Sequence, residues 1–345
     1  MFPGLAVARE LLRRGHAVKL WLAGTAPEAE SLAGWEGPVQ RVRASGFEGL
    51  ASFGSLLSAY RLAGATVDSL MRMRRDPPAV LLAMGSYASV GPALAARALG
   101  IPFVIHEANA IPGRAVALLA RCAWAVALTF ESAARYLPKV PAVVTGLPVR
   151  SDLQGQFAES LLEPNIFTVL VMGGSQGAHR INEVAVAAFL ELRNTGERFQ
   201  VIHLAGRADA DWVETAYRKA GVKALVFSFL REIGKAYCAA NMAISRAGAS
   251  SCMELALYRV PCLLIPFPTA RRDHQTANAR EMCQSGGADM IQQKDLTPGW
   301  LRDYLRVAMH SPEKLTAMRA SLAKVAIPDA VQRLADLVET AVKTL

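Results

Sequence analysis

The feature that most constrains this chain is a glycine-rich turn between an apolar run and a helical pattern. Residues 167–172 are β-branched and apolar, which is typical of a buried strand. Gly173-Gly174-Ser175-Gln176-Gly177 follows, and residues 178–193 carry apolar side chains at helical spacing. A strand, a glycine turn and a helix N-terminus present backbone N–H groups to a phosphate. The alternative is a tight turn that binds no ligand, because such turns are common.

Strand and helix patterns alternate along the whole chain, so the fold class is α/β, with two doubly wound parallel sheets. We expect strands at 16–22, 41–43, 80–84, 102–106, 125–128, 142–145, 167–172, 200–204, 224–227, 242–245 and 261–265. Helices are expected at 5–15, 50–75, 92–99, 116–122, 178–193, 211–220, 233–240 and 250–257, and the remainder is mostly helical. We predict domains at 1–150 and 165–326, a linker at 151–164, and a C-terminal helix in 327–345 that packs back on the first domain.

Composition excludes several classes. The longest apolar stretch, 115–130, is interrupted by Arg121 and is too short for a membrane span. Five scattered cysteines without a CxxC pair indicate reduced thiols in a cytosolic protein, and the first residues do not resemble a signal peptide. Residues 1–150 hold 16 Lys and Arg against 9 Asp and Glu, whereas the remainder holds 22 against 20. This imbalance suggests an anionic partner, or simply a solvated surface. Nucleic acid is not expected, because no basic run is interleaved with aromatic residues.

Polar side chains collect where the predicted strands end, and the carboxyl ends of parallel strands share one sheet edge. The residues are Ser86, Tyr87, His106, Glu107, Asn109, Arg150, Ser175, Gln176, Arg246, Glu254, Asp273, His274, Gln275 and Asn278. Glu254 could accept two ribose hydroxyls or be an ordinary helix-surface carboxylate. Arg150 could pair with a phosphate or be solvated. His106 could be a buried, satisfied histidine, and Glu107 is an acid or base only if it faces a cleft.

Several segments, in order along the chain, resemble the MurG family of UDP-N-acetylglucosamine-dependent N-acetylglucosaminyltransferases. They are Phe2-Pro-Gly-Leu-Ala-Val-Ala8, Met84-Gly-Ser-Tyr-Ala-Ser89, Ile101-Pro-Phe-Val-Ile-His-Glu-Ala-Asn109, Gly146-Leu-Pro-Val-Arg150, Gly173-Gly-Ser-Gln-Gly-Ala178, Arg246-Ala-Gly-Ala249 with Glu254, Asp273-His-Gln-Thr-Ala-Asn278 and Ile327-Pro-Asp-Ala330. The resemblance implies the GT-B architecture, with two doubly wound domains around a cleft, and no metal or other cofactor.

The resemblance also implies an activity and a donor site. The family transfers N-acetylglucosamine from UDP-N-acetylglucosamine to the C4 hydroxyl of the muramyl sugar of lipid I, with inversion, giving lipid II. Carried over, Ser175 holds the diphosphate, Leu230 and Ala249 lie against the uracil, and Glu254 binds the ribose. The other donor-site residues would be Asn109, Arg150, Gln176, Asn182, Arg246, Ser250, His274 and Gln275, and the residues needed for catalysis Tyr87, His106 and Glu107.

One departure from the family concerns the start of the chain. The family begins with a strand and a glycine-rich loop that ends in His, directly before Phe2-Pro3-Gly4. We expect that strand and loop to be missing here, through a start codon placed too late, so that the first sheet lacks a central strand. The missing loop would hold the acceptor diphosphate and a candidate base. We therefore expect a chain of this length to bind the donor but to transfer the sugar poorly.

Two other readings stay open: a catalytically impaired relative that only binds UDP-sugar, and another GT-B enzyme such as a sugar-nucleotide epimerase or a lipid galactosyltransferase. The resemblance implies a role in peptidoglycan biosynthesis, and hence in cell shape, cell division and the cell cycle. It also implies peripheral attachment to the cytoplasmic face of the cell membrane. Leu56, Leu57 and Tyr60 with Arg61, Arg72, Arg74 and Arg75 could make the membrane contacts, although the apolar face could equally be core.

Overall fold

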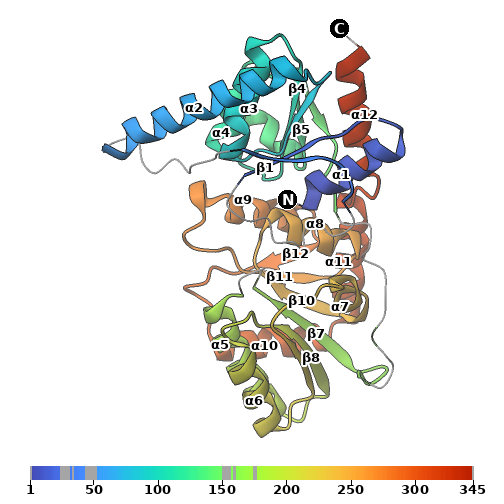
Figure 1. The fold of residues 1–345 in the computed structure, drawn as a ribbon. Coiled ribbons are helices and arrows are strands. Elements are labelled where there is room, and N and C mark those ends of the chain that lie inside the picture. The colour runs from blue at the N-terminus through green and yellow to red at the C-terminus, as the bar shows by residue number, and fades with distance from the viewer. Residues whose placement is uncertain are drawn as a thin grey trace. The chain divides into compact units, whose positions relative to one another are not determined.

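The computed structural model describes residues 2–23, 32, 35–42, 53–149, 157, 161–173 and 177–343, without the side chains of residues 2, 53–59 and 271. The chain divides into two compact units (Figure 1). Unit 1 comprises Met1–Arg150 together with Ile327–Leu345, and unit 2 comprises Ser151–Ala326. The C-terminal segment therefore returns to the first unit.

Unit 1 alternates helices and short parallel strands. Its elements are α1 (Phe2–Arg13), β1 (Leu20–Ala23), β2 (Val39–Val42), α2 (Phe53–Arg75), β3 (Leu81–Ala83), η2 (Tyr87–Ser89), α3 (Val90–Ala98), β4 (Phe103–Glu107), α4 (Arg114–Leu119), β5 (Ala125–Leu128), η3 (Glu131–Tyr136), β6 (Ala142–Val144) and α12 (Ala330–Lys343). Helices α1 and α12 pack together and are joined by ion pairs from Arg14 to Asp336 at 2.6 Å and to Glu339 at 3.2 Å.

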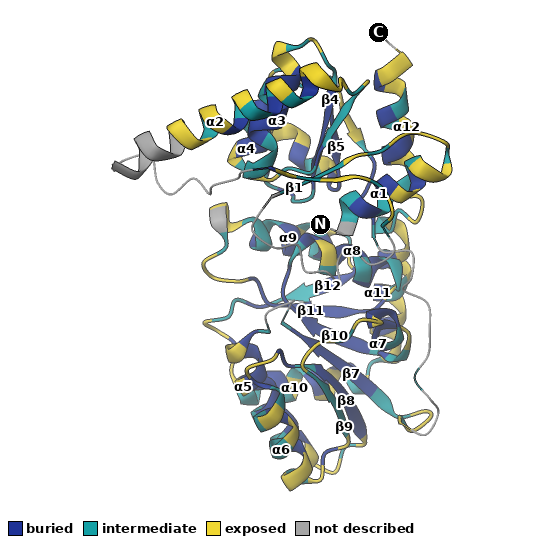
Figure 2. Ribbon diagram, viewed as in Figure 1, coloured by how far each residue is buried: buried dark blue, intermediate teal, exposed yellow. Residues whose placement is uncertain are grey.

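The strands of unit 1 form two separate sheets. One sheet has the order β3-β4-β5-β6, and within the part of the chain that the structure describes β1 and β2 pair only with each other. A cavity of about 1540 Å³ lies between them, lined by Leu20–Leu22 of β1 and by Leu81–Ala83 of β3. Residues of α1, α12 and the end of α2 complete its walls. In Figure 2 the inner strands β4 and β5 are buried, whereas β1 and β3 are only partly so.

Unit 2 is a doubly wound domain with one continuous sheet. Its elements are β7 (Phe167–Met172), α5 (His179–Arg193), β8 (Phe199–Leu204), α6 (Ala210–Ala220), β9 (Ala224–Phe227), α7 (Ile233–Ala239), β10 (Met242–Ser245), α8 (Ala249–Leu257), β11 (Cys262–Leu264), η4 (Arg271–Asp273), α9 (His274–Gln284), β12 (Ala288–Met290), α10 (Pro298–Met309) and α11 (Pro312–Val325).

The sheet of unit 2 has the order β12-β11-β10-β7-β8-β9, and every pairing is parallel. Its inner strands are buried because helices cover both faces, as in Figure 1. The chain runs from β7 to β8 and β9 on one side, then crosses to β10 on the other. The glycine turn after β7 therefore lies at the topological switch point, where doubly wound sheets bind ligands.

The predicted elements differ from the structure at particular places. The strand expected at 16–22 begins only at Leu20, because the backbone N–H of His16 still bonds the Leu11 carbonyl at the end of α1. Strand β12 was not expected, since its three residues include Asp289 and show no strand pattern. The helix expected at 250–257 forms as α8, which places Glu254 in its second turn.

Candidate functional site

The turn after β7 requires glycine at both described ends. A Cβ on Gly173 would collide with the backbone nitrogen of Ala178. Gly177 has φ +77°, and a Cβ there would lie 2.5 Å from the carbonyl oxygen of Ala205. Helix α5 begins two residues later at His179, so the N-terminus of the helix lies next to this turn. Ser175, which the resemblance assigns to the diphosphate, and Gln176, which it assigns to the donor site, lie outside the described residues. What remains is a close-packed turn at a helix N-terminus, the geometry that suits a phosphate.

The turn after β10 carries Glu254 to the same edge of the sheet. Strand β10 pairs directly with β7, so the residues that follow the two strands are neighbours. Glu254 is half-buried, and its Oε2 accepts a hydrogen bond of 2.7 Å from the hydroxyl of Tyr237. Tyr237 is itself buried and packs its ring 5.1 Å from that of Tyr258. The hydrogen bond from Tyr237 thereby orients the Glu254 carboxylate.

Three further residues assigned to the donor lie around α7 and α8. Ala249 is buried as the first residue of α8, and Ser250 beside it is exposed. Leu230 is half-buried in the turn that leads into α7. The small side chain of Ala249 and the apolar one of Leu230 are suited to the faces of a flat base, whereas the exposed Ser250 offers a hydroxyl.

Arg246 supports this edge from within. The side chain is 7% exposed, and burial lowers its pKa to about 10, so it stays charged near neutral pH. Its guanidinium donates to the carbonyls of Ile265 and Pro266, both at 3.2 Å, and to Oε1 of Gln293 at 2.6 Å. It also lies 5.3 Å from the ring centre of Phe267. Arg246 therefore holds the turn after β11 in place.

The turn after β11 also carries Gln275, in the first turn of α9. Gln275 Oε1 accepts a 2.9 Å hydrogen bond from the backbone N–H of Phe267. His274 is half-buried and begins α9 directly after Arg272 and Asp273, which both adopt positive φ. Asn278, buried one turn later, donates to the carbonyl of Ala247 at 3.1 Å and ties α9 to the β10 turn.

Asn182 does not reach the surface. The side chain is fully buried, and its Nδ2 donates to the carbonyl of Ala205 at 2.8 Å and to Asp209 Oδ2 at 2.7 Å. Its Oδ1 lies 3.0 Å from His203 Nε2. The expectation that Asn182 contacts the substrate is therefore contradicted by its burial. It instead braces the segment on which the glycine turn rests.

In unit 1, His106 and Glu107 are at the end of β4, and both are buried. His106 Nε2 lies 3.0 Å from the carbonyl of Gly146, so this nitrogen carries the hydrogen and donates it. Burial lowers the pKa of His106 to about 4, although the Gly146 carbonyl opposes the shift. The neutral, enclosed imidazole matches the structural alternative and not a group that meets the substrate.

Glu107 organises the loop that follows β4. Its Oε1 accepts from the backbone N–H and the Nδ2 of Asn109 at 2.9 and 3.2 Å, and its Oε2 from the N–H of Gly113 at 2.9 Å. Burial raises the pKa of Glu107, and these hydrogen bonds oppose that shift. At 3% exposed, the carboxylate does not face open solvent. The expected role as acid or base is thus not supported in this arrangement.

Two further predicted residues belong to unit 1. Tyr87 is half-buried and follows strand β3, which neighbours β4, and Arg150 lies outside the described residues.

Several supporting residues were not anticipated from the sequence. Tyr237 and Gln293 lie 17 and 47 positions from the side chains they bind, so no local pattern marks them. Asp209 could have been noticed, because an acidic residue two positions before the 211–220 pattern is a candidate helix N-cap.

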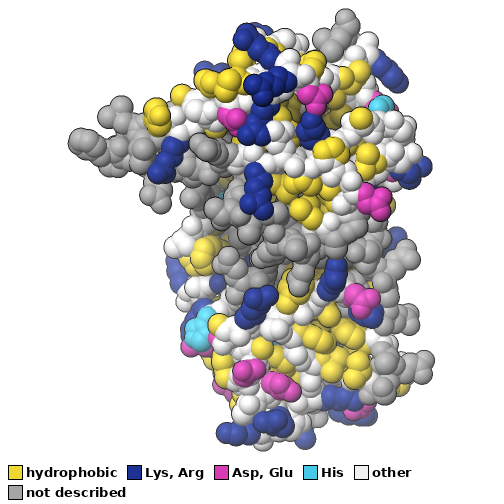
Figure 3. Space-filling model, in the orientation of Figure 1, with side chains coloured by type: hydrophobic (Ala, Val, Ile, Leu, Met, Phe, Trp, Pro, Cys, Tyr) yellow, Lys and Arg dark blue, Asp and Glu magenta, His cyan; other side chains and the backbone are white. Residues whose placement is uncertain are grey.

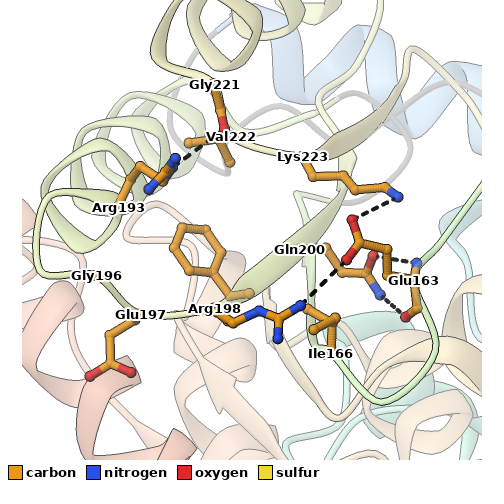
Figure 4. Close-up of a pocket in the computed structure, with 11 residues that line it drawn as sticks. Glu163, Ile166, Arg193, Gly196, Glu197, Arg198, Gln200, Gly221, Val222 and Lys223 are labelled. Carbon is orange, nitrogen blue, oxygen red and sulfur yellow. Dashed lines mark hydrogen bonds and ion pairs between the residues drawn. The ribbon is translucent and has the colours of Figure 1, made fainter.

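A second, smaller cavity in unit 2 lies at the amino-terminal ends of β8 and β9 (Figure 4). Its cations are already engaged: Lys223 and Arg198 flank Glu163 at 3.2 and 3.8 Å. The Gln200 amide closes a two-way hydrogen bond with the backbone of Glu163. Because the amino-terminal ends of the strands are at the opposite edge of the sheet from the glycine turn, this cavity takes no part in the site.

Two α/β units with parallel sheets, the second with a glycine turn at its topological switch point, have the architecture of the GT-B fold class. Family models agree with this class. Residues 1–128 match the glycosyltransferase family 28 N-terminal domain, and residues 168–334 match the glycosyltransferase family 28 C-terminal domain.

Individual relatives narrow the class further. A Myxococcus xanthus protein named UDP-N-acetylglucosamine–N-acetylmuramyl-(pentapeptide) pyrophosphoryl-undecaprenol N-acetylglucosamine transferase is 33% identical over 98% of this chain and 88% of its own length. The crystal structure of Acinetobacter baumannii MurG has a TM-score of 0.80 and 30% identity, covering 98% of this chain and 95% of that one. A putative Listeria monocytogenes UDP-N-acetylglucosamine 2-epimerase, 12% identical with a TM-score of 0.75, shares only the fold. The chain belongs to the MurG family.

Proposed function

We propose that this protein transfers N-acetylglucosamine from UDP-N-acetylglucosamine to the C4 hydroxyl of the muramyl sugar of lipid I. The product is lipid II, the lipid-linked precursor of peptidoglycan, which connects the enzyme to cell shape and division. The single observation that carries the proposal is the carboxyl edge of the unit 2 sheet. There the glycine turn and Glu254, which Tyr237 holds, follow adjacent strands. The turn suits the diphosphate of a nucleoside diphosphate, and Glu254 suits its ribose.

In this proposal the chain uses its own groups to bind the donor. The glycine turn, with Ser175 and Gln176, holds the diphosphate at the N-terminus of α5, where backbone N–H groups and the helix dipole stabilise the charge of departing UDP. Leu230 and Ala249 contact the uracil, with Ser250 at its rim, and Glu254 accepts the ribose hydroxyls. His274 and Gln275 bind the N-acetylglucosamine hydroxyls, and the family resemblance also assigns Asn109 and Arg150 to donor binding.

The remaining residues act by positioning. Arg246 and Asn182 hold the turns after β11 and β8. His106 and Glu107 hold the loop after β4 and the turn at Gly146, beside Tyr87 and Asn109. Because His106 and Glu107 are enclosed, their replacement should lower activity through the geometry of unit 1. Replacement of Glu107 should also weaken donor binding, because Glu107 holds Asn109.

Radiolabelled sugar transfer tests the activity, with lipid I as acceptor and UDP-N-acetylglucosamine alone as the comparison. Formation of lipid II supports the proposal. Donor binding without transfer would favour a relative that only binds UDP-sugar. Conversion of the free donor to its C2 epimer would favour an epimerase instead.

Calorimetry on Glu254→Ala tests the donor site. The variant should bind UDP-N-acetylglucosamine about 10- to 100-fold more weakly, since two hydrogen bonds to a charged group are lost. Glu197→Ala is the matched control, because Glu197 pairs with His310 on the surface, just before β8 and away from the turn. An unchanged affinity in Glu254→Ala would contradict the site assignment.

We also propose that unit 1 attaches to the inner membrane surface through α2. Tyr60, Val67 and Met71 are 78%, 55% and 50% exposed, and their spacing places them on one helical face. Exposed Arg61, Arg74 and Arg75 accompany them, and Figure 3 shows hydrophobic and basic side chains mixed over unit 1. The side chains of Leu56 and Leu57 lie outside the described residues. Among the described helices, none is long and apolar enough to cross a bilayer.

Sedimentation with anionic vesicles tests this attachment. Binding at low salt that weakens at high salt supports a surface contact with both apolar and basic parts. Tyr60→Ser combined with Met71→Ser should reduce it, whereas Tyr136→Ser, at an exposed site on η3, serves as the control. Equal binding of both variants would contradict a role for α2.

A further inference from the structure

A histidine at the start of α5, just after the glycine turn, has an acidic partner. His179 begins α5, and its ring is 67% exposed. Its Nδ1 lies 3.0 Å from both carboxylate oxygens of Asp209, which precedes α6. Because Gly177 rests against Ala205 in the same segment, this pair lies beside the phosphate-binding turn.

Asp209 is nearly enclosed, at 7% exposed, and is saturated with donors. Besides His179 it accepts from Trp212 Nε1 at 2.9 Å and from Asn182 Nδ2 at 2.7 Å. Burial would raise the pKa of Asp209, but these hydrogen bonds together lower it, so the carboxylate is ionised. Trp212 and Asn182 are neutral, so His179 is the cation that can balance it among these partners.

A buried chain of hydrogen bonds prevents Asp209 from turning away. Burial lowers the pKa of His203 to about 3, so this ring is neutral. Its Nε2 donates to Asn182 Oδ1 at 3.0 Å, and its Nδ1 therefore accepts from the Tyr217 hydroxyl at 2.8 Å. Asn182 is thus oriented with its Nδ2 toward Asp209. Each donor in this chain has its acceptor, and this order gives the network a single arrangement.

We propose that His179 is a positioning residue whose positive charge offsets Asp209 and strengthens binding of the donor diphosphate. The inference rests on the proposed function, because it assumes a diphosphate at the glycine turn. When His179 is neutral it can still donate from Nδ1, so the geometry survives. The negative charge of Asp209 is then uncompensated beside a dianionic ligand, and binding weakens.

The charged groups that face His179 are few in the described chain. Asp209 comes from the segment before α6, and Glu183 of its own helix lies 3.3 Å from Nε2. Arg180 shares Glu183 at 3.4 Å, and the Trp212 ring covers one edge of the imidazole. The hydrogen bond to Asp209 raises the pKa of His179 above its usual 6.5, with smaller contributions from Glu183. His179 is therefore charged below that raised pKa, and it loses its charge as the pH rises through it.

Calorimetry with UDP-N-acetylglucosamine at several pH values provides the test. The diphosphate diester keeps both negative charges over this range, so a change in affinity reports on the protein. The protein should bind the donor about three- to tenfold more tightly at about pH 6 than at about pH 9. His179→Gln, which keeps a donor but no charge, should bind weakly at both. His179→Arg should bind tightly at both. The kcat at saturating donor should change little, so that the effect is in KM.

Two results would overturn the inference: an affinity of the unaltered protein that does not depend on pH, or a His179→Gln variant that keeps the full pH dependence. Asp209→Asn gives a second check, because it removes the carboxylate that raises the pKa of His179, so the midpoint of the pH profile should move to lower pH. Circular dichroism shows whether each variant is folded. Absence of donor binding at every pH would instead contradict the proposed function itself.

Discussion

The two units contain strands of similar composition but bury them differently. In unit 2, β7 pairs with β10 on one side and β8 on the other, and its residues Val169–Val171 are fully buried. In unit 1, Leu81 and Leu82 of β3 are equally apolar, yet both are only half-buried, because β4 is the one strand that pairs with β3 among the described residues. The difference teaches that an apolar strand is buried by its neighbours in the sheet. A cavity of about 1540 Å³ lies beside Leu81–Ala83 of β3.

The close packing of unit 2 is tested most severely at Gly177. Gly177→Ala should destabilise the protein by on the order of 3 kcal/mol or more and abolish donor binding, since positive φ and a backbone clash act together. The control is Gly196→Ala, where φ is +81° but nothing lies within 4 Å of a Cβ. In that variant the free energy of unfolding should fall by only about 1–2 kcal/mol, the cost of a positive φ for alanine. Chemical denaturation measures both, and equal losses would show that the turn is loosely packed.

Hydrogen exchange compares the two sheets directly. Amides of β1 and β3 should open with a free energy about 2 kcal/mol or more below that of β7, because each of these strands has one edge on the cavity. Strand β5, which pairs on both sides within unit 1, is the internal control and should resemble β7. Uniform protection across β1, β3 and β5 would mean that the separation of the strands of unit 1 into two sheets does not weaken this unit.

Unit 1 also depends on charges where α1 meets α12. Hydrogen bonds from Arg13 and Arg14 lower the pKa of Glu10 from 4.5 to about 2, and Arg14 continues to Asp336. A lowered folded-state pKa stabilises the protein above pH 4.5, and that stability is lost as the pH falls towards 2. Glu10→Gln should therefore cost about 1–2 kcal/mol near neutral pH, reduced by screening at exposed Arg13, and less in acid.

Thermal unfolding of Glu10→Gln across this pH range checks the expectation. Glu191→Gln is the counterpart in unit 2, where Glu191 pairs at 3.0 Å with Arg302 on the surface. That variant should show a much smaller change, because the exposed pair is screened. Similar pH profiles for the two variants would argue that α1 does not rely on Glu10.

The smallest effect is expected at the start of α12, where Asp329 directly precedes the helix. Asp329 and Arg333 form an ion pair of 2.9 Å with both side chains about half exposed. Asp329→Asn should leave the unfolding midpoint of unit 1 unchanged within error. A clear loss of stability would show that the start of α12 contributes more to unit 1 than its exposed charges suggest.

Much of the fold was predictable because apolar runs and turn residues are local signals. The strands β5, β9 and β10 and the turn after β7 lie where the sequence places them. Strand β12 was missed because a three-residue strand has too little pattern, and only its pairing with β11 defines it. Among site residues, Glu254 lies at the expected edge, whereas Asn182, His106 and Glu107 proved to be enclosed. The burial of a residue depends on the side chains that pack over it, and these come from segments that a short stretch of sequence does not include.

The sequence by itself determined the alternation of strands and helices, the glycine turn and the family, since each depends on residues close together in the chain. Only the tertiary structure decided which polar side chains remain available to a ligand. Tyr237 orients Glu254, Gly146 engages His106, and Asp209 engages His179, across separations of 17, 40 and 30 residues. These pairings form because a buried polar group must find a partner, and the partner is whichever group the packing brings within reach.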